Sequence, residues 1–168
     1  MIYQFFPRTA QPEDALLNVY NCFEDVEDII NSTKQSEESN WVLSKVSAGL
    51  EDLEFRVEKS KKDSDKIIVP VLFGKNGSID KRFDADALSG DGRIVVEVEA
   101  GRAYTNNQFL KDIFQASVMQ GVEYLVLAVR ETYRDKQKDF DQIYKFIDTL
   151  YSSERLKLPL KGILLVGY

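Results

Sequence analysis

Two amphipathic helices are predicted in the first third of the chain. Apolar residues recur at intervals of three and four from Pro12 to about Thr33, which is typical of a helix with one buried face. Acidic residues directly after Pro12 favour a helix start, because they meet the positive end of the helix dipole. After a polar loop, Asn40 is expected to cap a second helix. The buried stripe of that helix is predicted to be Leu43, Val46, Leu50, Leu53 and Val57.

Continuous apolar runs predict three buried strands further along the chain. The first covers 67–73, where Pro70 indicates an edge position or a bulge because it cannot donate a ladder hydrogen bond. The other two cover 124–129 and 162–168, and such runs are expected of strands covered on both faces. Helical spacing predicts helices over 108–119, capped by Thr105 or Asn106, and over 138–151. Strand, helix and strand in succession predict a parallel crossover.

The segment 81–102 predicts a β-hairpin, because two alternating runs flank the turn sequence Ser-Gly-Asp-Gly at 89–92. Side chains alternate between the two faces of a strand, so acidic residues two apart share a face. Folding the hairpin is therefore expected to gather up to four carboxylates on one face of two paired strands. These are the carboxylates of Asp84, Asp86, Glu97 and Glu99.

Carboxylates held this close repel one another, and two physical effects offset the repulsion. One is a divalent cation bound by the oxygens, and the other is a raised pKa that leaves some carboxyls protonated. Mg²⁺ suits a site of a few carboxylates completed by waters and a phosphate. A simpler interpretation places Asp84 and Glu97 in solvent on a half-exposed hairpin. Because Glu97 and Glu99 lie within the apolar run IVVEVEA, we favour metal binding.

This pattern resembles the PD-(D/E)XK nuclease superfamily, whose motif is an Asp, a spacer, then Asp or Glu, any residue and Lys. Asp86 precedes Glu97 by eleven residues, and Asp84 precedes it by thirteen. Glu99 stands where the usual Lys would be, so the chain resembles the Glu-x-Glu variant found in some restriction endonucleases. No Pro precedes either Asp.

The resemblance implies an α/β fold with a restriction endonuclease-like αβββαβ core, a mixed central sheet flanked by helices. The core would span 41–130 of a single domain covering 1–168. An acidic N-terminal helical extension, 1–39, would precede it, and a C-terminal helix and strand, 131–168, would follow.

The resemblance also implies one or two Mg²⁺ ions, with Mn²⁺ as a substitute. Asp86 would be the bridging ligand, with Asp84 competing for that role, and Glu97 would be the second ligand. Glu99 would hold the ion or a water molecule on it in place of the missing lysine. From the preceding helix, the superfamily sometimes contributes a Glu, and the candidates here are Glu51 and Glu54.

Candidate residues for binding a phosphate follow the acidic strand in the sequence. Lys111 and Gln115 lie four residues apart on one face of the helix that follows, where the superfamily sometimes relocates its lysine. Arg102, directly after the strand, is a second candidate cation. Asn107 belongs to a polar patch with Tyr104 that we expect to contact substrate, although helix capping explains the same residues.

Composition removes several other classes of site. The chain has no histidine, which excludes catalytic triads and histidine-ligated zinc sites, and its single cysteine excludes an internal disulfide. The opening MIYQFF is too short for a signal peptide or a membrane span, so no membrane partner and a cytoplasmic location are the expectations.

The charge is unevenly distributed along the chain. The net charge of minus 6 divides into minus 7 over residues 1–56 and plus 1 over residues 57–168. An acidic segment repels a phosphate backbone, whereas the remainder need not. The charge pattern thus permits a nucleic-acid surface on the later part of the chain.

Two functions remain. The first is a Mg²⁺-dependent endonuclease that hydrolyses DNA phosphodiester bonds, restriction-like or defence-related, for which a homodimer would allow cutting of both strands. The alternative is a catalytically silent protein of the same fold that binds a protein or a nucleic acid.

Overall fold

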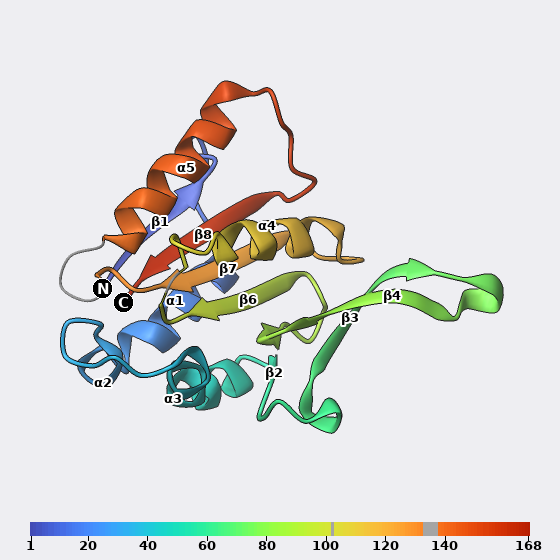
Figure 1. Ribbon diagram of the computed structural model, residues 1–168, viewed down its shortest axis with the longest axis horizontal. Helices are drawn as coiled ribbons and strands as arrows, with labels where there is room; N and C mark the ends of the chain where they lie inside the picture. Colours follow the sequence, from blue (N-terminus) through green and yellow to red (C-terminus); the bar gives the residue numbers. More distant parts are fainter. Residues whose placement is uncertain (102, 133–137) are drawn as a thin grey trace.

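The computed structural model describes residues 1–101, 103–132 and 138–168, which form a mixed six-stranded sheet with helices on both faces and a separate two-stranded sheet (Figure 1). The helices are α1 (Asp14–Glu24), α2 (Glu27–Ile30), α3 (Ser39–Asp52), α4 (Gln108–Val118) and α5 (Asp139–Ser153). The strands are β1 (Ile2–Phe6), β2 (Arg56–Val57), β3 (Ile67–Phe73), β4 (Ile79–Ala85), β5 (Ala87–Leu88), β6 (Ile94–Glu99), β7 (Tyr124–Val129) and β8 (Gly162–Gly167). The fold is α/β, as the sequence predicts.

The main sheet has the strand order β1-β8-β7-β6-β5-β2. Strands β6, β7 and β8 are parallel, while β1, β5 and β2 pair antiparallel with their neighbours. Helix α4 connects β6 to β7, and α5 connects β7 to β8, so the predicted strand-helix-strand crossover is confirmed and is followed by a second one.

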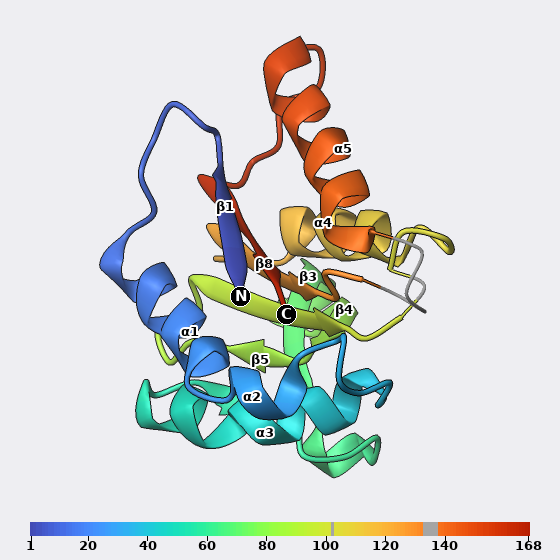
Figure 2. The same ribbon diagram turned by 90° about the vertical axis from the view of Figure 1, so that its left-hand side faces the viewer.

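Two apolar layers enclose the sheet, one on each face. Side chains of α1, α2 and α3 pack on one face with Val96 and Val126, and those of α4 and α5 pack on the other with Val95 and Leu127. Figure 2 shows these helix groups on opposite sides of the strands. Strands β7 and β8 are buried along their whole length, which explains why their sequences are continuous apolar runs rather than alternating ones.

The first sixty residues differ from the prediction in three places. The first predicted helix is two helices, α1 and α2, and α3 begins at Ser39 with Glu38 in the N-cap position, so that Asn40 lies inside the helix. Val57 continues the apolar stripe of α3 in sequence but lies in β2, because the chain leaves the helix after Asp52. The opening residues form β1, an edge strand, so the segment 1–39 is more than a helical extension.

The predicted strand over 67–73 forms, but outside the main sheet. It is β3, and it pairs only with β4 in the two-stranded sheet, with an irregular register between Pro70 and Leu72 that confirms the predicted bulge. Its outer end is exposed rather than buried. The short strand β2 occupies the corresponding position in the main sheet, beside β5.

The predicted hairpin is correspondingly divided. Its turn is present, with the Gly92 amide donating to the Ser89 carbonyl at 2.9 Å and the Ser89 amide donating to the Ile94 carbonyl at 2.9 Å. Of the residues predicted for the first strand of the hairpin, those of β5 pair with β6, whereas residues 79–85 turn away and pair with β3. Asp86 lies at the junction between β4 and β5.

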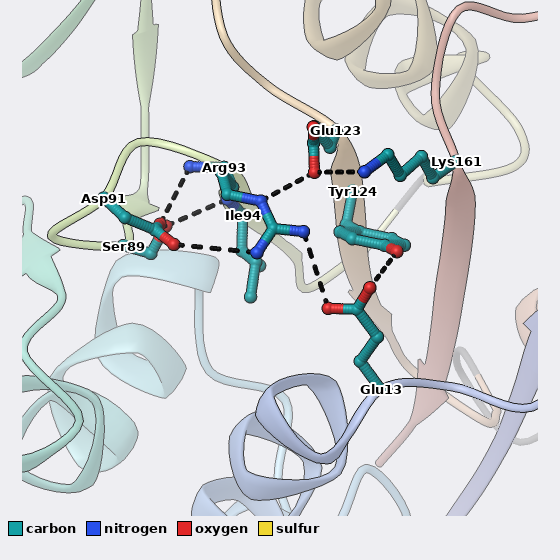
Figure 3. A network of polar contacts seen from close by, with 8 residues as sticks. All are labelled: Glu13, Ser89, Asp91, Arg93, Ile94, Glu123, Tyr124 and Lys161. Atoms are coloured by element: carbon teal, nitrogen blue, oxygen red, sulfur yellow. Dashed lines mark hydrogen bonds and ion pairs between the residues drawn. The ribbon is translucent and has the colours of Figure 1, made fainter.

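A polar network centred on Arg93 joins the starts of the three parallel strands (Figure 3). The Arg93 guanidinium donates to Glu123 at 2.6 Å, and the Arg93 carbonyl accepts from the amides of Glu123 and Tyr124. Lys161, just before β8, lies 2.9 Å from the same Glu123 carboxylate. Glu13, just before α1, accepts a hydrogen bond from the Tyr124 hydroxyl. The network fixes β6 at the end opposite to Glu97 and Glu99.

Candidate functional site

A cavity of about 320 Å³ opens beside the C-terminal half of β6 and the first turns of α4. The four hairpin carboxylates singled out in the sequence, Asp84, Asp86, Glu97 and Glu99, line it together with Lys111 and Gln115. Its other lining residues are Ser39, Asn40, Glu58, Lys61, Lys66, Val98 and Asp112. The structure therefore brings together residues from α3, the loop after β2, the β4-β5 junction, β6 and α4.

Asp86 lies across from Glu97, because the pairing of Ala87 with Val96 places the next residues of the two antiparallel strands opposite each other. The Asp86 carboxylate accepts a hydrogen bond from the Val98 amide at 2.7 Å. This bond fixes the side chain against β6. Asp86 lies at the break between β4 and β5, just outside the pairing of β5 with β6, which runs from Ala87 opposite Val96 to Leu88 opposite Val95.

Asp84 lies on the rim of the cavity and differs from Asp86 in its surroundings. Its carboxylate is exposed and pairs with Lys66 Nζ at 2.6 Å. Between the two candidates for the inner position, the geometry places Asp86 next to Glu97 and leaves Asp84 neutralised by a lysine.

Glu97 and Glu99 project from the same side of β6, as alternation predicts, toward the N-terminal half of α4. Glu97 Oε1 is buried and has no hydrogen-bond partner among the described residues. Asp112 Oδ2, from α4, is likewise buried and without a partner. The carboxyl groups of Glu99 and Asp112 are hydrogen-bonded to each other, with protonated Glu99 as the donor. Two buried carboxylate oxygens are thus left without a donor from the part of the chain that the structure describes.

The electrostatics of the cavity follow from burial and from the number of carboxyls. Burial, reinforced by the neighbouring acids, raises the pKa of Asp86 to about 7 and that of Glu99 to about 8. Burial raises the pKa of Asp112 to about 6, and burial together with Asp86 and Asp112 raises the pKa of Glu97 well above its ordinary range. The Lys111 ammonium opposes each of these increases. The cavity therefore favours any cation that can approach the oxygens.

The sequence contained a signal for Asp112 that was missed. Phe109, Ile113 and Ala116 form the buried stripe of α4, and Asp112 is three residues after the first and four before the last. An acidic residue on an apolar helical face is unusual, because charged side chains are rarely buried without a partner. Helical spacing alone thus marks Asp112 as a candidate.

Glu58 is the second acidic residue that was missed, and nothing in its local sequence marks it. It follows the two-residue strand β2, and its amide donates to the Asp86 carbonyl at 2.8 Å. Burial is the main cause that raises the pKa of the Glu58 carboxyl. Its place on the cavity wall depends on the pairing of β2 with β5, which is 30 residues away in the chain.

Three predicted residues lie away from the cavity, so their assignment to the site is corrected. Glu51 faces a neighbouring groove and pairs with Lys59 at 3.1 Å, because α3 turns this side of the helix outward. Glu54 is exposed beyond the end of α3, where the chain reverses through a φ of 64°. Asn107 precedes α4 in a left-handed conformation and lines a different groove, with Tyr104 and Lys145. Arg102 lies outside the described residues.

One observation speaks against a divalent cation in the cavity, and another speaks in favour of one. Across the part of the chain that the structure describes, no three acidic or cysteine side chains are already placed to share one metal ion. The donor set is nevertheless the oxygen-only set that Mg²⁺ prefers. The partnerless oxygens of Glu97 and Asp112 lack the hydrogen bonds that buried polar atoms normally have, and a cation would satisfy them. The residue types therefore fit a hard divalent cation after side-chain adjustment.

Comparison with known proteins returned no matching family model, no matching curated protein and no matching solved structure. Within the described residues, no helix is long and apolar enough to span a bilayer.

Proposed function

We propose that the protein is a Mg²⁺-dependent nuclease that hydrolyses DNA phosphodiester bonds, with Mn²⁺ able to replace Mg²⁺. The observation that carries the proposal is the cavity that Asp86, Glu97 and Glu99 line together, with a buried Glu97 oxygen that receives no hydrogen bond from the described residues. A purely structural cluster would be expected to satisfy that oxygen with a donor from the protein.

The order of elements supports the same proposal. Helix α3 is followed by β2, β5 and β6, which are successive antiparallel neighbours, and then α4 crosses over to the parallel strand β7. This order agrees with the αβββαβ order expected from the resemblance to the PD-(D/E)XK superfamily when β3 and β4 are counted as an insertion between the first two strands. Asp86 directly precedes β5, the second of these strands, and Glu97 lies in β6, the third.

Within this proposal Asp86, Glu97 and Glu99 hold the cation, with Asp112 behind Glu99. When bound, Mg²⁺ polarises the phosphate and lowers the pKa of a water molecule. Hydrolysis adds water to phosphorus, breaks one bridging P–O bond and leaves a phosphate monoester and an alcohol. Lys111, exposed on the cavity rim, would stabilise the negative charge that develops on the phosphoryl oxygens. Gln115, one turn further along α4, would orient a phosphate oxygen.

A second candidate is a catalytically silent protein of this fold that binds a protein or a nucleic acid. It is favoured by two facts: the described carboxylates do not converge on one ion position as they stand, and Glu99 replaces the lysine of the motif. On that reading the raised pKa values keep the carboxyls protonated, and no ion is needed.

The test combines ion binding with cleavage. Calorimetric titration of Mg²⁺ and Mn²⁺, with and without a short DNA duplex, should show binding to the wild type that Glu97→Gln abolishes. Single-turnover cleavage of the duplex should fall by at least about 100-fold in the same variant, because one ligand of the ion is lost. Gln keeps the volume of Glu, so the fold is retained.

The matched control is Glu51→Gln, which removes one carboxylate outside the cavity and should leave both readouts unchanged. Identical purification of the variants excludes a contaminating nuclease. Ion binding that survives Glu97→Gln, or its absence from the wild type even with DNA present, would contradict the proposal and leave the second candidate.

A further inference from the structure

Strands β3 and β4 form a ribbon, here named the arm (residues 66–85), that extends away from the rest of the molecule (Figure 1). Its strands pair with each other and not with the six-stranded sheet. Each strand has seven residues, and a rise of about 3.3 Å per residue makes the arm about 23 Å long. A ribbon of this length requires a stable base to keep a fixed direction.

The base of the arm is anchored on α4, the helix that carries Lys111 and Asp112. The rings of Phe83 and Phe114 meet edge to face, with centroids 6.3 Å apart. Just beyond α4, Gln120 donates from its amide to the Pro70 carbonyl at 2.9 Å and from its side chain to the Val71 carbonyl. Lys66 and Asp84, also at the base, line the candidate cavity. The arm therefore continues one wall of the cavity outward.

The outer part of the arm exposes large apolar side chains. Leu72 and Phe73 are each 56% exposed, and Ile79, which pairs with Phe73, is 50% exposed. Isolated exposed apolar residues are ordinary, but three neighbours at the end of a projecting ribbon indicate a surface that another molecule covers.

The charge of the arm distinguishes between possible occupants. Residues 66–85 carry four basic and two acidic side chains, a net charge of plus 2 on a chain whose total is minus 6. Lys66 is neutralised by Asp84, whereas Lys75, Lys81 and Arg82 are exposed. Arg82 shares the face of β4 with Asp84 and so with the cavity. Lys81 lies on the opposite face, 4.8 Å from the centre of the Phe83 ring.

We infer that the arm enters a groove of duplex DNA and holds the duplex against the cavity, with its exposed cations on phosphates and its apolar end against base edges. This inference rests on the proposed function and adds to it that the DNA substrate is double-stranded. The major groove, about 12 Å wide, admits a two-stranded β-ribbon. In that groove apolar side chains contact thymine methyl groups, and lysine and arginine contacts to phosphate supply affinity.

The apolar end of the arm could also bind a second copy of this chain. Duplex DNA is favoured because the exposed cations flank the apolar residues, and because the arm is continuous with the cavity that the proposed function assigns to phosphate hydrolysis.

The test measures binding of a fluorescein-labelled DNA duplex of about 20 base pairs by fluorescence anisotropy. The buffer contains Ca²⁺ in place of Mg²⁺, so that the carboxylates of the cavity are neutralised while little of the DNA is hydrolysed. Two arm variants are compared with the wild type: Lys81→Gln with Arg82→Gln, and Phe73→Ser. The control, Arg155→Gln with Lys157→Gln, removes the same charge from an exposed loop outside the arm. Thermal unfolding verifies that every variant is folded.

Each arm variant should bind the duplex about tenfold more weakly, and the charge variant should reduce the salt dependence by about two counterions. The control should bind as the wild type does. Equal binding by arm and control variants, or no duplex binding by the wild type, would overturn the inference. Arm variants that turn a dimer into a monomer in light scattering and leave DNA binding unchanged would instead identify an interface between copies.

Cleavage in Mg²⁺ separates this inference from the proposed function. Arm-dependent duplex binding without any cleavage would support the arm and reject the nuclease. Cleavage that requires Glu97 but is indifferent to the arm variants would support the nuclease and reject the arm.

Discussion

Asp112 is the most enclosed of the acidic residues at the candidate site, with a side chain that is only 1% exposed. One of its oxygens is hydrogen-bonded to Glu99 when that residue is protonated, and the other has no donor within residues 1–101, 103–132 and 138–168. A buried ion with so few partners is costly, because the interior solvates charge poorly. Asp112 therefore destabilises the ion-free fold, and its presence is accounted for if the carboxylate acts on a bound cation.

We predict that Asp112→Asn stabilises the ion-free protein and weakens Mg²⁺ binding. With a pKa of about 6, the Asp112 carboxyl is ionised at pH 8, so removing the charge should raise the free energy of unfolding by about 2 kcal/mol. Chemical denaturation at pH 8 in a chelator measures the stability, and calorimetry measures the binding.

Asp84→Asn is the matched control for that experiment. It removes an exposed carboxylate that pairs with Lys66, and exposed ion pairs contribute about 0–1 kcal/mol. If Asp112→Asn lowers the free energy of unfolding by as much as Asp84→Asn does, the ionised Asp112 carboxylate does not destabilise the fold.

At the scale of elements, β6 carries the candidate site and is fixed at both ends by different means. At its start, the Arg93 network ties β6 to β7, β8 and α1 (Figure 3). Toward its end, the Val98 amide bonds to Asp86. The start of the strand therefore holds the register, while the other end is available to present side chains to the cavity.

We predict that Arg93→Met lowers the free energy of unfolding, which chemical denaturation measures as a lower midpoint concentration. The loss arises because Glu13 and Glu123 each lose a cationic partner, although Lys161 still lies near Glu123. Arg155→Met, in the exposed loop before β8, is the control and should unfold at the wild-type denaturant concentration. Equal midpoints for the two variants would show that the network contributes no stability.

At the scale of the whole molecule, the carboxyl cluster couples folding to pH and to cations. The pKa values of Asp86 and Glu99 are about 7 and about 8 in the folded chain, above the ordinary value of about 4 expected when unfolded. The folded state then binds more protons than the unfolded state between these values. Stability from this cluster is complete at about pH 4 and is lost as the pH rises toward about 8.

We predict that the ion-free protein has a lower melting temperature at pH 8 than at pH 5, and that Mg²⁺ reduces the difference. Mg²⁺ should raise the melting temperature more at pH 8, because the ion binds deprotonated carboxylates. Scanning calorimetry over this pH range, with and without Mg²⁺, measures both effects. Glu97→Gln should flatten the dependence on pH and on Mg²⁺, and a wild-type melting temperature that rises from pH 5 to pH 8 would contradict the linkage.

The sequence by itself determined the features that depend on neighbouring residues. The apolar runs of β7 and β8, the turn after β5 and the shared side of Glu97 and Glu99 all follow from spacing of one to four residues. The Asp112 signal was of the same kind and was readable on the stripe of α4. Such features are predictable because backbone geometry alone fixes which side chains share a face.

Only the tertiary structure decided which segments meet. The apolar sequence of β3 is compatible with a place in the main sheet or in the arm. Its pairing with β4 and the packing of the arm on α4 place it in the arm. The same kind of distant contact brought Glu58 to Asp86, paired Asp84 with Lys66 and set β1 at the edge of the sheet. Local periodicity predicts that a residue is buried. It does not predict which surface covers the residue, because that surface is formed by residues far away in the chain.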